Sequence, residues 1–76
     1  MIEFSRLAEA VPGVLGWGAE DGERSYVITF DNNFPDYGYR ASWRVVGEKT
    51  QYLPDGYKSF AQAEAALVAI QQRKAN

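Results

Sequence analysis

The sequence predicts an α+β domain in which an N-terminal and a C-terminal helix pack on one face of a three-stranded antiparallel sheet, in the order α-β-β-β-α. Three observations predict it. Apolar residues recur with helical spacing near both ends of the chain, the residues between alternate apolar and polar side chains, and turn-forming residues separate these segments. The 76 residues contain no repeat and no linker, so we expect a single domain over residues 1–76.

The first element is expected to be a helix over residues 4–11. Its apolar face follows the i, i+3, i+4, i+7 spacing and consists of Phe4, Leu7, Ala8 and Val11. Pro12 and Gly13 then end the helix. The glycine-rich residues 14–18 that follow are expected to form an irregular apolar crossing, with Trp17 as its anchor.

Three strands are expected in the middle of the chain, at residues 25–30, 39–45 and 50–53. The second strand has the clearest faces: one carries Tyr39, Ala41, Trp43 and Val45, and the other carries Arg40, Ser42 and Arg44. The register of the second hairpin stays open at this point. A two-residue loop places Tyr52 opposite Trp43, whereas a three-residue loop places Leu53 there.

The C-terminal helix is predicted to begin at Ser59, because Ser59 and Gln62 form a capping-box pattern after the turn at residues 54–56. Its inner stripe is expected to contain Phe60, Ala63, Ala66, Leu67 and Ile70. On the outer side, Ala65 and Ala69 leave a smooth surface that a second copy of the chain could contact, so a homodimer is one alternative; helix propensity alone is the other.

The residue types argue against catalysis. The chain has no histidine and no cysteine, which removes the commonest general base, the usual transition-metal ligands and the thiol nucleophile. No phosphate loop or dinucleotide motif is present. A chain this short also rarely encloses a pocket of the ~300 Å³ at which small-ligand sites begin. We therefore expect no enzymatic activity, no metal and no cofactor.

No stretch approaches the ~20 apolar residues that a membrane helix needs, and the first residues lack the pattern of a signal peptide. We therefore expect no membrane partner and a cytoplasmic location. The formal net charge is −2, with ten carboxylates against eight lysine and arginine residues. This balance argues against strong non-specific binding to phosphates.

The segment 31–38 is the main candidate for a binding site, because it is longer than a hairpin needs and places large rings beside turn formers. Rings held on a loop can anchor a protein interface. The candidate partner-binding residues are Asp31, Asn33, Phe34, Asp36 and Tyr37. Two interpretations stay open for Phe34, which could contact a partner or fold back onto the core. A calcium site from the acidic and amide residues of this loop is disfavoured, because the loop lacks a bidentate glutamate.

The outer face of the sheet offers an alternative site. Arg40 and Arg44 on that face, together with Tyr52, form a mixed cationic and aromatic patch of the kind that stacks and pairs with single-stranded nucleic acid. The competing interpretation is an ordinary solvated face. We therefore expect a protein partner, with nucleic acid as the alternative.

From Tyr39 onward, the aromatic strand, the segment 56–60 and the alanine-rich residues 61–69 resemble the C-terminal part of several small bacterial and phage domains. The element order resembles that of the double-stranded-RNA-binding domain, whose last helix opens with a lysine cluster. Only Lys58 lies near that position here, so that activity is not carried over. The three strands and helix are also similar to the arm-binding domain of tyrosine recombinases, which reads DNA with the outer sheet face but is normally more basic.

A small, acidic domain without cysteine is also similar in kind to the inhibitor proteins that phages direct against host enzymes or CRISPR complexes. This anti-CRISPR-like resemblance implies a protein whose role is to occupy a surface of a larger bacterial protein or nucleoprotein complex. The expected function is therefore a non-catalytic protein-binding module.

Overall fold

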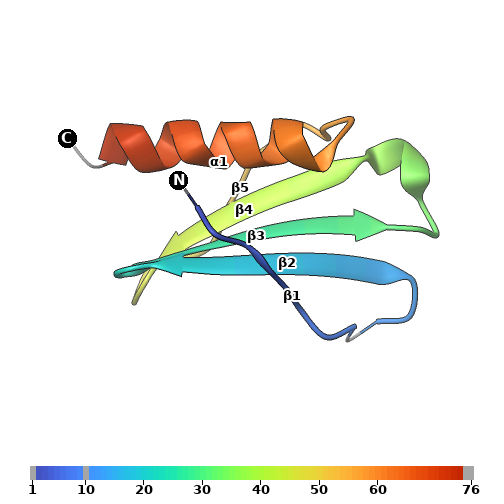
Figure 1. Ribbon diagram of the computed structural model, residues 1–76, viewed down its shortest axis with the longest axis horizontal. Helices are drawn as coiled ribbons and strands as arrows, with labels where there is room; N and C mark the ends of the chain where they lie inside the picture. Colours follow the sequence, from blue (N-terminus) through green and yellow to red (C-terminus); the bar gives the residue numbers. More distant parts are fainter. Residues whose placement is uncertain (1, 10, 75–76) are drawn as a thin grey trace.

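Five antiparallel strands form one sheet, and a single helix lies across one of its faces (Figure 1). The computed structural model describes residues 2–9 and 11–74. The strands are β1 (Ser5–Arg6), β2 (Val14–Asp21), β3 (Arg24–Asp31), β4 (Tyr39–Val45) and β5 (Gln51–Tyr52). A short 3-10 turn, η1 (Pro35–Tyr37), follows β3, and the helix α1 (Phe60–Lys74) comes last. The strands lie in the sheet in their sequence order.

The predicted α-β-β-β-α order is wrong, because the sheet has five strands and the chain has no N-terminal helix within its described residues. Ser5 and Arg6 instead pair with β2 as its edge partner. Phe4 packs edge-on against Phe60, whereas Leu7 lies on the opposite face over the glycines of β2. An eight-residue helix is marginal in water, and in the extended chain Ile2 is buried and Phe4 is partly buried, because alternate positions face the core.

The segment 14–18 is part of a regular strand, which corrects the expectation of an irregular crossing. Gly16 and Gly18 alternate with Leu15 and Trp17, so both glycines lie on the outer face. Leu7 fills the space there: a Cβ atom on Gly18 would lie 3.1 Å from its Cδ2. The glycines therefore permit close packing of Leu7, the residue after β1, rather than forming a turn.

The other strands were predicted at nearly their observed positions. In the β3–β4 pair, Tyr26 is opposite Trp43 and Ile28 is opposite Ala41. Neither expected register of the last hairpin is correct, because β5 places Gln51 opposite Trp43. The Glu48 amide donates to the Val45 carbonyl at 2.9 Å, and further residues precede β5, so the connection is longer than the two or three residues assumed.

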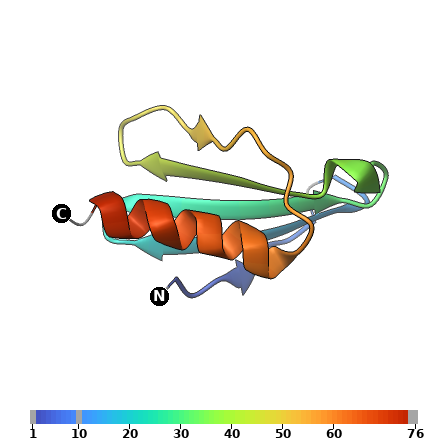
Figure 2. The same cartoon turned by 90° about the horizontal axis from the view of Figure 1, so that it is seen from above.

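The core lies between the sheet and α1, which runs along one face (Figure 2). Its buried residues are Ile2, Tyr26, Ile28, Ala41, Ala63, Leu67 and Ile70. The predicted inner stripe of the helix is confirmed for Ala63, Leu67 and Ile70, which are buried, and Phe60 is partly buried against them, whereas Ala66 is only half-buried. At the start of α1, the Gln62 amide donates to Ser59 Oγ at 3.2 Å, and Gln62 Oε1 accepts from the Lys58 amide at 3.0 Å.

Aromatic rings close one end of this core. The Trp17 ring lies 5.1 Å from Phe60 and 6.1 Å from Tyr39, between centroids. The guanidinium carbon of Arg6 lies over the Trp17 ring, 5.5 Å from its centroid. Trp17 is thus an anchor, as expected, but from within a strand.

Within residues 2–9 and 11–74, no helix has the length and apolar character needed to cross a membrane.

Candidate binding surface

The β3–β4 loop carries two exposed rings. Phe34 is 55% exposed and Tyr37 is 61% exposed, and their rings stack on each other at 5.6 Å with an interplanar angle of 18°. Neither ring belongs to the buried core. Phe34 therefore does not fold back onto the core. Its exposed ring is available to contact a partner, which was the other interpretation left open by the sequence.

Local hydrogen bonds fix the conformation of this loop. The Tyr37 amide donates to the Phe34 carbonyl at 3.1 Å, which forms the turn that brings the two rings together. Asp31 Oδ1 accepts from the Asn33 amide at 2.8 Å, as in an Asx turn. The Asn33 side chain then donates to the Pro12 carbonyl at 3.3 Å. Asp31 and Asn33, predicted as contact residues, thus serve to hold the loop in place.

The other side of the loop is held by direct backbone contact. Tyr39 and Tyr57 form an isolated bridge through two hydrogen bonds of 2.8 Å. Gly38 has a φ of +68°, and a Cβ atom there would lie 2.5 Å from the Tyr57 carbonyl oxygen. A Cβ atom on Gly56 would overlap the Tyr37 carbonyl oxygen. Only glycine at both positions lets the loop approach the chain that precedes α1.

This approach creates a groove between η1 and residues 56–58, which we call the loop groove. It has a volume of about 560 Å³. Its side-chain lining includes the rings Phe30, Tyr37 and Tyr57, the cations Arg40 and Lys58, and the carboxylate Asp36. Tyr57 and Lys58 were not predicted as site residues, because no local pattern indicates the bridge between Tyr39 and Tyr57.

The outer face of the sheet, which α1 leaves uncovered, carries a second groove that we call the sheet groove. It has a volume of about 500 Å³, and its lining includes Val27, Thr29, Arg40, Ser42, Thr50 and Tyr52. Tyr52 is 77% exposed and lies opposite Ser42. Arg44 lies on the same face, two residues beyond Ser42 in β4, but it does not line the groove.

Arg40 lines both grooves, so the loop and the sheet face form one continuous surface. Of the residues predicted from sequence, Phe34, Asp36, Tyr37, Arg40 and Tyr52 contribute side chains to this surface. Two candidate sites that the sequence treated as alternatives are thus neighbours. Exposed tyrosine, phenylalanine and arginine are the residue types enriched at protein interfaces.

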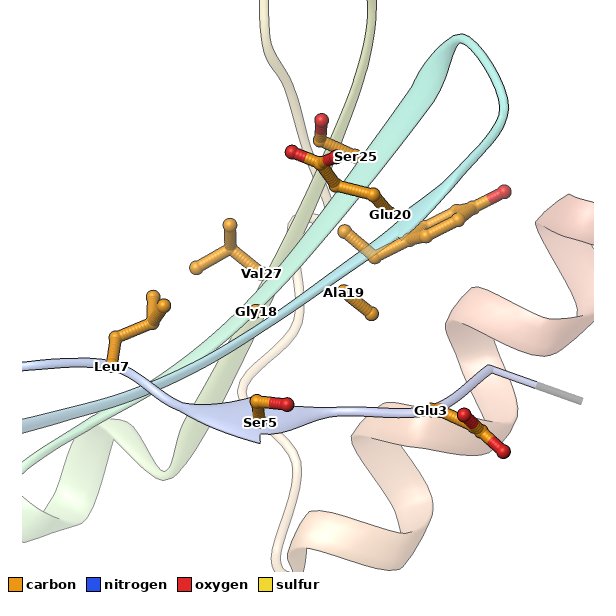
Figure 3. A pocket seen from close by; sticks show the side chains of 9 residues that line it. Glu3, Ser5, Leu7, Gly18, Ala19, Glu20, Ser25 and Val27 are labelled. Atoms are coloured by element: carbon orange, nitrogen blue, oxygen red, sulfur yellow. The ribbon is translucent and has the colours of Figure 1, made fainter.

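A third pocket lies towards the other edge of the sheet and is lined by residues in and around β1 and by residues of β2 and β3. Its volume is about 370 Å³, and its lining includes Glu3, Ser5, Leu7, Glu20 and Ser25. The carboxylates of Glu3 and Glu20 lie at opposite ends of this pocket and point in different directions (Figure 3). They therefore do not form the close carboxylate pair that acid–base chemistry needs.

No metal site is evident in the described part of the chain, which contains no group of three or more acidic, histidine or cysteine side chains placed to hold an ion. The calcium ligands considered from the sequence are dispersed, since Asp31 is engaged by the loop backbone whereas Asp36 lines the loop groove. Comparison of the chain with protein-family models, with curated proteins and with solved structures finds no match.

Proposed function

We propose that this protein is a non-catalytic protein-binding module that contacts its partner with the β3–β4 loop and the adjoining outer face of the sheet. The exposed, stacked pair of Phe34 and Tyr37 supports this proposal most directly. About 100 Å² of each ring stays in water, and burying it at ~25 cal/mol per Å² would contribute roughly 2–3 kcal/mol per ring. A partner that covers both rings would recover this free energy.

The way the loop is held also supports binding. Hydrogen bonds tie it to the β1–β2 connection on one side, and the glycine contacts tie it to residues 56–57 on the other. A loop that is already ordered loses little conformational entropy when a partner binds it. We further propose that binding inhibits the partner, which would be a larger bacterial protein or nucleoprotein complex, as small phage proteins do.

The experiment is capture of partners from a bacterial lysate by the immobilised protein, followed by mass spectrometry. The double variant Phe34→Ala, Tyr37→Ala should lose the captured partner, while its melting temperature stays within a few degrees of the parent. Val46→Ala is a matched control, because Val46 is 67% exposed but lies beyond the other end of β4. Retention of the partner by the double variant, or its loss by the control, would contradict the proposal.

A second candidate function is binding of single-stranded nucleic acid, because the sheet places Arg40, Arg44 and Tyr52 on one face. Fluorescence anisotropy with a labelled deoxythymidine oligonucleotide tests it. Binding should weaken with added salt, with a slope of about −0.7 per neutralised phosphate, and the variant Arg40→Ala, Arg44→Ala should abolish it. No binding at low salt would exclude this function. The net charge of −2 favours the protein partner.

A further inference from the structure

The loop groove combines two positively charged side chains with apolar walls. We propose that it binds the carboxylate of a glutamate or aspartate in an extended, otherwise apolar segment of the partner protein. This inference rests on the proposed function and names the chemistry that the partner brings to this part of the surface.

The placement of the two cations follows from the backbone. Arg40 is the second residue of β4. Its Cδ atom lies 3.8 Å from the position that a Cβ atom on Gly56 would take. Its stem therefore lies beside Gly56, within van der Waals distance of that position. Lys58 lies two residues further along the same segment and lines the same groove. Arg40 and Lys58 thus line one recess, although they come from a strand and from the segment before the helix.

Both cations are available for a ligand. Among residues 2–9 and 11–74, the side chains of Arg40 and Lys58 take part in no hydrogen bond and no ion pair; the one ion pair described joins Arg6 and Glu9 at 3.8 Å. An arginine side chain offers paired N–H donors in the geometry that a carboxylate accepts. The backbone amides of Lys58 and Gln62 already donate hydrogen bonds within the helix cap. The attraction for an anion therefore comes from the Arg40 and Lys58 side chains rather than from these amides.

The remaining lining determines which anion fits. Phe30, Tyr37 and Tyr57 give the groove apolar walls, which suit an apolar residue next to the acidic one. Asp36 lines the same groove and repels further negative charge. A single carboxylate between apolar neighbours therefore fits better than a nucleic acid, which brings a row of phosphates. The exposed ring of Phe34, which stacks on the Tyr37 wall of the groove, would contact the flanking residues.

The experiment is an NMR titration of the full chain, labelled with ¹⁵N, with the peptide acetyl-Gly-Leu-Glu-Leu-Gly-amide. A matched peptide with Gln in place of Glu is the control. The Glu peptide should shift the backbone amides of Gly38, Gly56 and Lys58, and the Gln peptide should bind about tenfold more weakly, as expected for loss of a charged hydrogen-bond acceptor. Equal affinity for the two peptides, or no shifts with either, would overturn the proposal.

Variants test the residues involved. Arg40→Gln and Lys58→Gln should each reduce the preference for the Glu peptide, and Asp36→Asn should strengthen binding of that peptide up to about fivefold. Lys49→Gln is the matched control, since Lys49 is exposed in the β4–β5 connection away from the groove, and it should bind like the parent. A preference that survives both Arg40→Gln and Lys58→Gln would refute the assignment.

Two further probes separate other ligands. Inorganic phosphate at the same concentration should bind more weakly than the Glu peptide, as should a deoxythymidine pentanucleotide; tighter binding of either would overturn the choice of a protein carboxylate. The two proposals also fail differently. If Phe34→Ala, Tyr37→Ala loses the captured partner but Arg40→Gln, Lys58→Gln keeps it, only the carboxylate proposal fails. If the first variant keeps the partner, the binding surface itself is wrong.

Discussion

Replacing Tyr26 with Phe is expected to stabilise this protein. Tyr26 lies in the middle of the sheet and is fully buried, and its hydroxyl is the buried side-chain group without a hydrogen-bond partner in the described part of the chain. Burying a hydroxyl without a partner costs about 1–3 kcal/mol. Phe keeps the ring and loses only the contacts of one oxygen atom, so we expect a net gain of about 1 kcal/mol.

Urea and thermal unfolding measure this gain. For a domain of this size, 1 kcal/mol corresponds to a rise of about 4–8 °C in melting temperature and, with an m-value near 1 kcal/mol/M, to a urea midpoint about 1 M higher. Tyr52→Phe is the control, because Tyr52 is mostly exposed and its hydroxyl meets water; its free energy of unfolding should change by less than about 0.5 kcal/mol. A Tyr26→Phe variant less stable than the parent would refute the reasoning and indicate a buried water bonded to the hydroxyl.

Three further substitutions test the packing. Gly18→Val should destabilise by about 1–3 kcal/mol in urea unfolding, because its side chain meets Leu7, and adding Leu7→Ala should restore part of that loss; additive effects would argue against the contact. Leu67→Ala removes a fully buried side chain and should cost about 2–5 kcal/mol, read from the same assay; a loss under 1 kcal/mol would show that α1 packs differently. Ser59→Ala removes the bond to the Gln62 amide and should cost about 1 kcal/mol by thermal circular dichroism, whereas an unchanged melting temperature would show that the cap is dispensable.

The second half of the fold could be predicted from the sequence because its signals are local. The strand Tyr39–Val45 alternates without interruption, and the cap at Ser59 is a pattern of adjacent residues. The inner stripe of α1 follows from the helical period, and Leu67 and Ile70 are buried as expected. Each of these elements can be predicted from a pattern of residues that are close together in the sequence.

The first half could not be predicted in the same way, because its structure depends on contacts between distant residues. Gly16 and Gly18 look like loop residues until Leu7 is placed over them. The spacing of Phe4 and Leu7 suits a helix, yet the two side chains lie on opposite faces of a sheet. The pairing of β1 with β2 is likewise not visible in a short window of sequence, whereas the β2–β3 hairpin is local, with Asp21 opposite Arg24, and β2 was missed because its glycines were interpreted as loop residues.

The candidate surface was predicted in part. The exposed rings at Phe34 and Tyr37 and the shared face of Arg40 and Tyr52 follow from loop composition and strand alternation. The contribution of Lys58 could not be foreseen, because it requires the approach of Gly38 to the residues before the helix. Two glycines separated by 17 intervening residues become neighbours only in the folded chain.

The match between strand order and sequence order has a consequence for how the chain acquires its structure. Each strand pairs with the one synthesised just before it, so the sheet needs only short loop closures and can assemble quickly. The helix emerges from the ribosome after the five strands, and until then one side of the sheet, with Tyr26 and Ile28 at its centre, lacks the cover that α1 provides. Nascent chains that end before α1 should accordingly be the species most prone to aggregation.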